Sequence, residues 1–127
     1  ARALLLLGSE RAWVVHGADG IDELSTTGYT KVAEVRDGSV HTFHVHPGQF
    51  GLRRSAPGEL EGGDAARNAA IIERVLEGHT GPTRDVVLLN AGASLFIAGR
   101  ASTVRGSAFA RAGAFRASLT SLAPSSQ

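Results

Sequence analysis

The sequence contains no cysteine and no methionine. Without cysteine, neither disulfide bonds nor thiolate metal sites can form. Without methionine no initiator residue is visible, so we expect the chain to be a fragment or a processed product. Apolar runs are also short: Ala3–Leu7 is shorter than the core of a secretory signal, and no run approaches the roughly 20 residues that span a bilayer. We therefore expect a cytoplasmic protein with no membrane partner.

A strong charge of either sign is absent as well, because the formal net charge is only +1 with the histidines neutral. Such a balance gives no general attraction to nucleic acid or to anionic membranes. No acidic residue follows Asp85, and the arginines beyond it lack the interleaved exposed aromatic residues that nucleic-acid surfaces carry. We interpret this end as a solvated helix face and expect no nucleic-acid partner. Its arginines are Arg100, Arg105, Arg111 and Arg116.

The first part of the chain predicts a small sheet. With 127 residues, of which 43% are hydrophobic, the chain can bury one core. Ala3–Leu7 is expected to end a helix at Gly8, and Trp13–His16 is an apolar run between breakers, which predicts a buried strand. Two strand-like runs between residues 30 and 46 flank Asp37-Gly38, whose residue types suit a type I′ turn and predict a β-hairpin. We expect the lone first strand to pair with strands upstream of this chain.

The second part predicts helices. The Gly- and Pro-rich stretch Gln49–Gly63 is typical of a connecting loop, and apolar residues then recur at helical spacing from residue 65 to 76, after the capping residue Asp64. Val86–Ala98 is apolar nearly all round, which predicts a buried helix, and a third helix is expected over 104–122. This order predicts an α/β domain in which helices cover a short sheet.

The residues with the clearest chemical potential follow the first strand. Asp22 and Glu23 lie just past its carboxyl end, where open α/β sheets bind ligands. Adjacent carboxylates supply the hard oxygen ligands that Mg²⁺ prefers alongside water and substrate phosphates. The alternative is structural: Asp19, Asp22 and Ser25 are residue types that form turns and cap helices. The residues by themselves leave both interpretations open.

A family resemblance favours the metal. Val14–Ser25 resembles the metal-loop segment of anthranilate phosphoribosyltransferases, and three further blocks match in the same order, at 62–69, 85–91 and around 112–114. The resemblance covers essentially the whole chain. It implies a single partial domain over 1–127, the carboxy-terminal part of a phosphoribosyltransferase/nucleoside-phosphorylase-like α/β domain without the donor loop and the amino-terminal helical region.

The function that the resemblance implies is a glycosyltransferase reaction of tryptophan biosynthesis. Such enzymes move a 5-phosphoribosyl group from phosphoribosyl pyrophosphate (PRPP) to anthranilate and release pyrophosphate. By position, Asp22 and Glu23 would hold the second Mg²⁺, while no residue here is implied as catalytic, and His16 and Ser25 have no assigned role. Intact family members are homodimers through their amino-terminal region. The present chain is therefore expected to be inactive without its missing partner segment.

One loop could be mistaken for the family's donor loop, and another departs from the family pattern. Gly62-Gly63-Asp64 has glycines of the kind that cradle phosphate, but it matches a different family block, and we interpret it as a helix start. Tyr29 stands where the family more often has proline or a small residue, which puts the conformation of that turn in question.

Other polar residues have two interpretations each. His41, His44 and His46 are close in sequence, and a transition-metal site is one hypothesis, but no carboxylate accompanies them, which favours an exposed hairpin edge. Asn90, inside the most apolar helix, is either a ligand contact or a core residue bonded to backbone, and we favour the second. For the chain as a whole, the alternatives to an enzyme segment are a non-catalytic nucleic-acid-binding relative and a non-functional remnant.

Overall fold

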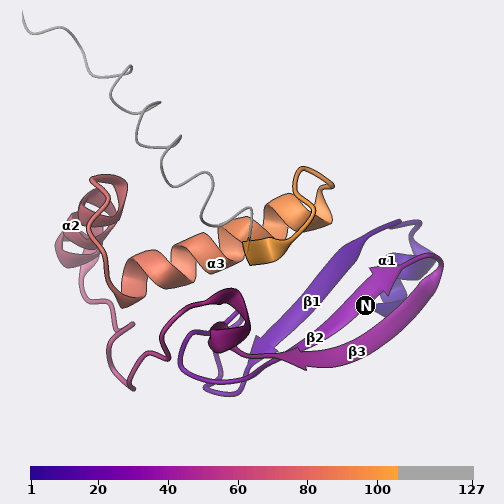
Figure 1. Ribbon diagram of the computed structural model, residues 1–127, viewed down its shortest axis with the longest axis horizontal. Helices are drawn as coiled ribbons and strands as arrows, with labels where there is room; N and C mark the ends of the chain where they lie inside the picture. The colour runs from indigo at the N-terminus through magenta and orange to yellow at the C-terminus, as the bar shows by residue number, and fades with distance from the viewer. Residues whose placement is uncertain (106–127) are drawn as a thin grey trace, which may run out of the picture.

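The computed structural model describes residues 1–105. The block around 112–114, Arg111, Arg116 and all but the start of the helix expected over 104–122 lie outside the described residues. Three strands form one sheet, a long helix lies along one side of it, and a second helix stands off at the end of the molecule (Figure 1). The elements are α1 (Arg2–Leu6), β1 (Ala12–Gly17), β2 (Thr30–Arg36), β3 (Ser39–Val45), the 3₁₀ turn η1 (Pro47–Phe50), α2 (Ala65–Leu76) and α3 (Pro82–Ile97).

The sheet is antiparallel throughout, in the order β1-β2-β3. The predicted hairpin is confirmed as β2 and β3, which pair from Thr30 opposite Val45 to Arg36 opposite Ser39. Asp37 and Gly38 adopt φ values of 50° and 71°, and a type I′ turn requires positive φ at both central positions. The order of elements and the small sheet agree with the expected α/β architecture.

The first strand differs from its expectation. β1 pairs antiparallel with β2 along its whole length, from Ala12 opposite Val35 to Gly17 opposite Thr30, a pairing that the sequence pattern did not indicate. It is also only half-buried, with Val14 42% exposed. The reason is that it is an edge strand here: within residues 1–105 no strand pairs with its second edge. An antiparallel sheet can leave one face in water.

The core lies between α3 and one face of the sheet. Val32, Leu24 and Leu89 are each no more than 1% exposed and pack in one cluster. The ring of Trp13 extends this cluster by contacting an aromatic ring of β3 and one of α3, Phe43 at 5.8 Å and Phe96 at 5.6 Å between centroids. The core thus joins the acidic loop, the sheet and α3.

α3 itself is buried on one side, whereas the sequence predicted burial nearly all round. Its buried residues are Val86, Leu89, Gly92 and Ala93, while Val87 on the outer side is 50% exposed. A three-stranded sheet covers only one stripe of a helix, which explains the difference. Within the described residues no helix is long and apolar enough to cross a membrane.

α2 begins and ends as expected. The Asp64 carboxylate accepts a hydrogen bond from the Arg67 backbone N–H at 2.8 Å, so the interpretation of residues 62–64 as a helix start is confirmed. At the other end Gly78 adopts φ 86°, and the N–H of His79 donates to the carbonyl of Arg74, the arrangement of a Schellman cap. α2 has no buried residue, and it lies beside α3 away from the sheet (Figure 1).

Replacing Leu89 tests the position of the core. Leu89→Ala leaves a cavity among side chains that cannot fully collapse, and we expect a loss of about 2–5 kcal/mol in unfolding free energy, measured by urea denaturation. Val87→Ala on the outer side of the same helix is the control and should stay within about 0.5 kcal/mol. Equal losses would mean that α3 does not pack as described.

Candidate functional site

The acidic loop, residues 18–29, connects β1 to β2 at one end of the sheet. Its base is closed by two backbone hydrogen bonds, from Gly17 N–H to the Ile21 carbonyl and from Ala18 N–H to the Tyr29 carbonyl, both at 2.9 Å. Gly17 has no room for a side chain, since a Cβ there would lie 2.4 Å from the Asp19 carboxylate. The glycine therefore lets the loop fold back tightly over the end of β1.

Asp19 organises the interior of this loop. Its carboxylate accepts hydrogen bonds from the hydroxyls of Ser25 and Thr27 and from the backbone N–H of Ile21. Partial burial acts to raise the pKa of Asp19, but these hydrogen bonds outweigh it and hold the pKa below its ordinary value. The proposed role of Asp19 and Ser25 as turn-formers fits, whereas no helix follows them to be capped.

Asp22 and Glu23 differ from Asp19 in their surroundings. Neither carboxylate has a hydrogen-bonding or ion-pairing partner within residues 1–105. Burial, and next the neighbouring charge of Asp22, raise the pKa of Glu23 above its ordinary value. The loop thus holds two adjacent carboxylates that repel one another and that no protein cation neutralises in the described part of the chain.

Asn90 connects the loop to α3. Its side-chain oxygen accepts from the backbone N–H of Leu24, and its amide nitrogen donates to the carbonyls of Leu24 and Val86, all at 2.9 Å. Asn90 is bonded to backbone groups, as favoured, but it is half-buried rather than a core residue. Both backbone groups of the residue next to Glu23 are therefore tied to the long helix.

The segment after η1 holds the loop from another side. The backbone N–H of Ser55 donates to the Thr26 carbonyl at 2.8 Å, and the hydroxyls of the same two residues are 2.9 Å apart. Arg54 donates through Nε to the Thr27 carbonyl at 2.6 Å. Thr26 and Ser55 are buried, so this contact joins two loops far apart in sequence inside the protein.

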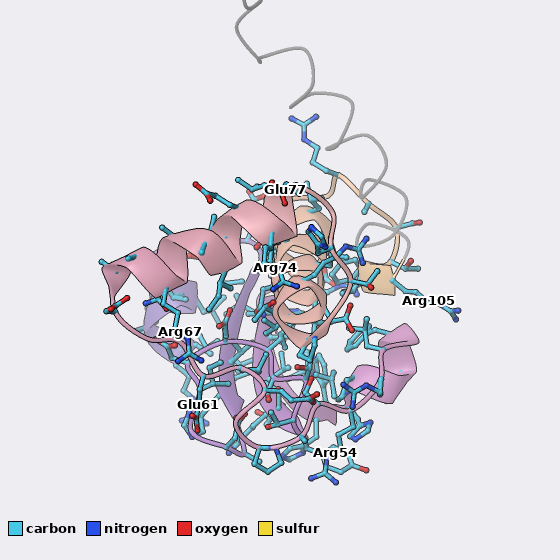
Figure 2. The ribbon with its side chains drawn as sticks, turned by 90° about the vertical axis from the view of Figure 1, so that its left-hand side faces the viewer. Arg54, Glu61, Arg67, Arg74, Glu77 and Arg105 are labelled. Carbon is cyan, nitrogen blue, oxygen red and sulfur yellow. The ribbon has the colours of Figure 1, made fainter. Side chains whose placement is uncertain are left out.

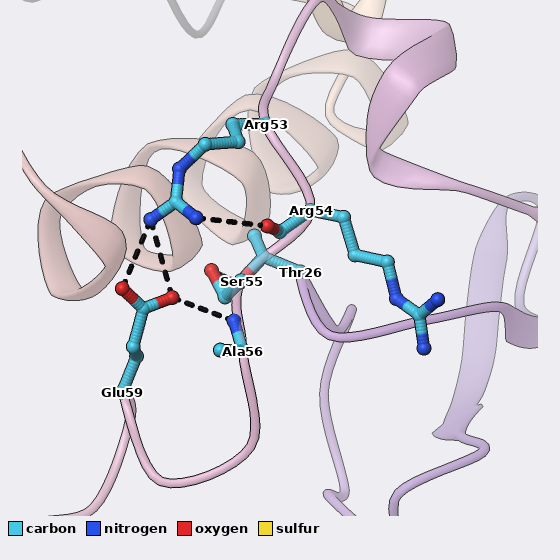
Figure 3. A network of polar contacts seen from close by, with 6 residues as sticks. All are labelled: Thr26, Arg53, Arg54, Ser55, Ala56 and Glu59. Carbon is cyan, nitrogen blue, oxygen red and sulfur yellow. Dashed lines mark hydrogen bonds and ion pairs between the residues drawn. The ribbon is translucent and has the colours of Figure 1, made fainter.

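A second polar network stiffens that segment, as Figure 3 shows. One guanidinium nitrogen of Arg53 donates to both carboxylate oxygens of Glu59, at 3.0 and 3.1 Å. The hydrogen bond from the Ala56 N–H, and then Arg53, hold the pKa of Glu59 below its ordinary value. Burial raises the pKa of Asp85, in the first turn of α3, and the charges of Arg84 and then Arg53 partly offset that rise.

An open cleft of about 480 Å³ separates the two loops. Asp19 and Thr27 line it on one side, and Arg54 and Glu61 on the other; Figure 2 shows these last two side chains at the lower end of the molecule. Asp22 and Glu23 are not among its lining residues.

Two of the three neighbouring histidines, His41 and His44, lie in β3, and His46 follows it as the cap of η1. His41 and His44 point to opposite faces, because side chains alternate along a strand. The Nδ1 atom of His46 accepts from the Gly48 N–H at 3.2 Å, and its ring packs against that of Tyr29 at a tilt of 53°, with centroids 4.9 Å apart. Tyr29 is therefore accommodated at the surface, 60% exposed and lying against this ring. Among residues 1–105 no three His, Asp or Glu side chains group closely enough to hold a metal ion.

Comparison with known proteins then defines the family. Residues 1–117 match the model of the glycosyl transferase family, a/b domain. The chain belongs to this family. The anthranilate phosphoribosyltransferase of Azorhizobium caulinodans is 52% identical over the entire chain, which covers 38% of that protein. This member of the glycosyl transferase family thus spans little more than a third of the length of a curated relative.

Solved structures of relatives agree with the fold. An anthranilate phosphoribosyltransferase from Thermus thermophilus has a TM-score of 0.77 at 38% identity, covering 91% of this chain and 33% of that one. The Saccharomyces cerevisiae enzyme in complex with PRPP and Mg has a TM-score of 0.69 at 26% identity, covering 94% of this chain and 38% of that one. The resemblance to anthranilate phosphoribosyltransferases is confirmed, and these relatives do not favour the nucleic-acid-binding alternative.

The inner support of the loop was not foreseen. Sequence patterns pointed to Asp22, Glu23 and Asn90, but not to the hydrogen bonds from Thr27 to Asp19 or to the contact with Ser55. One signal was present: an aspartate followed by a cluster of hydroxyl residues, Ser25, Thr26 and Thr27, favours side-chain hydrogen bonds within a turn.

Removing the Asp19 carboxylate should loosen the loop in a pH-dependent way. Because the folded-state pKa of Asp19 lies below its ordinary value of 3.8, its contribution is present above that pH and is lost as the pH falls through the folded-state pKa. We expect Asp19→Ala to cost on the order of 1 kcal/mol at pH 7, since the carboxylate is partly solvated. Urea denaturation at pH 7 and pH 3 should show the difference from wild type shrinking in acid; a constant difference would argue against an ionised Asp19.

Proposed function

We propose that this chain is the segment of an anthranilate phosphoribosyltransferase that supplies the carboxylates for the second Mg²⁺. The intact enzyme transfers a 5-phosphoribosyl group from PRPP to anthranilate and releases pyrophosphate. The observation that carries the proposal is that Asp22 and Glu23 have no hydrogen-bond or ion-pair partner among residues 1–105, in a loop where Asp19 accepts three hydrogen bonds. Relatives over the same region are named for this activity, and one was solved with PRPP and Mg.

The two carboxylates fit a magnesium ion by their chemistry. Mg²⁺ typically takes one or two carboxylates and completes its shell with water and substrate phosphates, so two protein ligands are enough. A cation between Asp22 and Glu23 would also remove the repulsion that helps to raise the pKa of Glu23. When bound, Mg²⁺ supplies positive charge where negative charge grows on the departing pyrophosphate.

The chain's own part in the reaction is to hold these carboxylates in place. The acidic loop is fixed from α3 through Asn90, from the next loop through Ser55, and internally through Asp19. Preorganised groups stabilise a transition state better than groups that must move into position. PRPP and anthranilate would be bound largely by the remainder of the homodimeric, cytoplasmic enzyme, and the isolated 127-residue chain is expected not to turn over.

Neutralising either carboxylate tests the metal site. In calorimetry of the chain with Mg²⁺ and PRPP, Asp22→Asn and Glu23→Gln should each weaken binding by at least about tenfold, or about 1.4 kcal/mol. Glu61→Gln, which removes a carboxylate in the neighbouring cleft, is the matched control and should bind as wild type does. A parallel assay with anthranilate should detect no turnover. Equal binding by all variants would overturn the assignment.

Glu23 should also make metal binding and stability depend on pH. Because its folded-state pKa is raised above 4.5, the ionised carboxylate costs folding free energy at higher pH, and the chain is relatively more stable when it is protonated. Glu23→Gln should therefore raise the unfolding free energy at pH 7, by on the order of 0.5 kcal/mol, and the gain should vanish in acid. Mg²⁺ affinity of the wild type should fall as the pH drops through the raised pKa, as followed by calorimetry.

A further inference from the structure

Asn90 contacts the acidic loop at the residue that immediately follows the carboxylate pair. Leu24 has its backbone N–H and its carbonyl bonded to the same side-chain amide, which pairs with it as a neighbouring strand would. The third bond, to the Val86 carbonyl one turn earlier in α3, fixes the orientation of that amide. All three distances are 2.9 Å, within the range of good hydrogen bonds.

The surroundings make this link rigid. The Leu24 side chain is 1% exposed and packs in the same core cluster as Leu89, the residue before Asn90. On the far side of Leu24, the Ser25 N–H donates to the Thr30 hydroxyl at 2.9 Å. The backbone on the C-terminal side of Glu23 is therefore held by a helix, a core side chain and a strand.

We propose that Asn90 is a positioning residue that sets the conformation of the acidic loop and thereby places Asp22 and Glu23. The consequence for the metal rests on the proposed function; the clamp on Leu24 does not. Only a side chain with both a donor and an acceptor at amide spacing can satisfy the two backbone groups of one residue. Asparagine meets this need within the otherwise apolar α3, whereas aspartate lacks the donor and leucine lacks both.

Two variants of the full 127-residue chain test the inference. Asn90→Asp keeps the shape and the acceptor but loses the donor, and Asn90→Leu keeps the volume and loses both. Two quantities are measured: amide hydrogen exchange at Leu24 and Ser25, and the affinity for Mn²⁺ alone, followed by electron paramagnetic resonance, since carboxylate sites for Mg²⁺ also accept Mn²⁺. We expect exchange at these amides to rise by at least about tenfold and Mn²⁺ affinity to fall by about tenfold or more.

The controls separate positioning from general destabilisation. Ser94→Ala removes a hydrogen bond to the Asn90 carbonyl on the same helix without touching the loop, and it should change neither quantity. Exchange at Val32, in the centre of the sheet, should stay unchanged in all variants; the clamp is rejected if loosening is equal at Val32 and Leu24. It is also rejected if exchange at Leu24 is unaltered, and the positioning of the carboxylates is rejected if exchange rises while Mn²⁺ affinity does not change.

The two proposals can fail separately. A wild-type chain that does not bind Mn²⁺ would count against the proposed function. Exchange at Leu24 would then still decide the role of Asn90 in holding the loop: a rise confined to the loop supports it, and an unchanged rate overturns it.

Discussion

The packing of α3 on one face of the sheet is the interaction on which the other features of the molecule depend. Leu89 fills the space between this helix and Val32 of the central strand, and Leu24 of the acidic loop is buried in the same cluster. One turn of α3 therefore supports the sheet through Leu89 and the loop through Asn90. Because core side chains are closely packed, the loop cannot shift without disturbing the sheet that carries it.

The three carboxylates of the acidic loop have different surroundings, and the difference affects the stability of the fold. Asp19 receives hydrogen bonds that stabilise its charge and the turn around it. Asp22 and Glu23 receive none from the described residues, and Glu23 is partly buried beside a like charge, which is unfavourable for the isolated fold. Partly desolvated charge of this kind is typical of sites that bind a ligand, since groups arranged for binding often lower the stability of the unliganded fold. Asp19 therefore stabilises the loop, whereas Asp22 and Glu23 are carried by the loop without contributing to its hydrogen bonds.

Local features were predictable wherever one short stretch determines the outcome. The Asp37-Gly38 turn follows from the ability of these residues to adopt positive φ, and the start of α2 follows from the capping chemistry of Asp64. Features that depend on partners distant in sequence were not predictable. The pairing of β1 with β2, and the burial of α3 on one side only, are decided by which surfaces meet, and hydrophobic patterns carry little information about that. The bond between Ser55 and Thr26 belongs to the same class, because the two residues are 29 positions apart.

The sequence by itself determined the types of the elements, the family resemblance and the two residues proposed to bind Mg²⁺, because turn chemistry, periodicity and motif order are properties of neighbouring residues. Tertiary structure decided how those two residues are held. Asn90 lies 66 positions from Leu24, and only the folding of α3 onto the loop brings the amide to both backbone groups. The physical reason is that hydrogen bonds and burial act through space. The partners of a polar residue in an apolar helix are therefore set by the surface against which that helix packs.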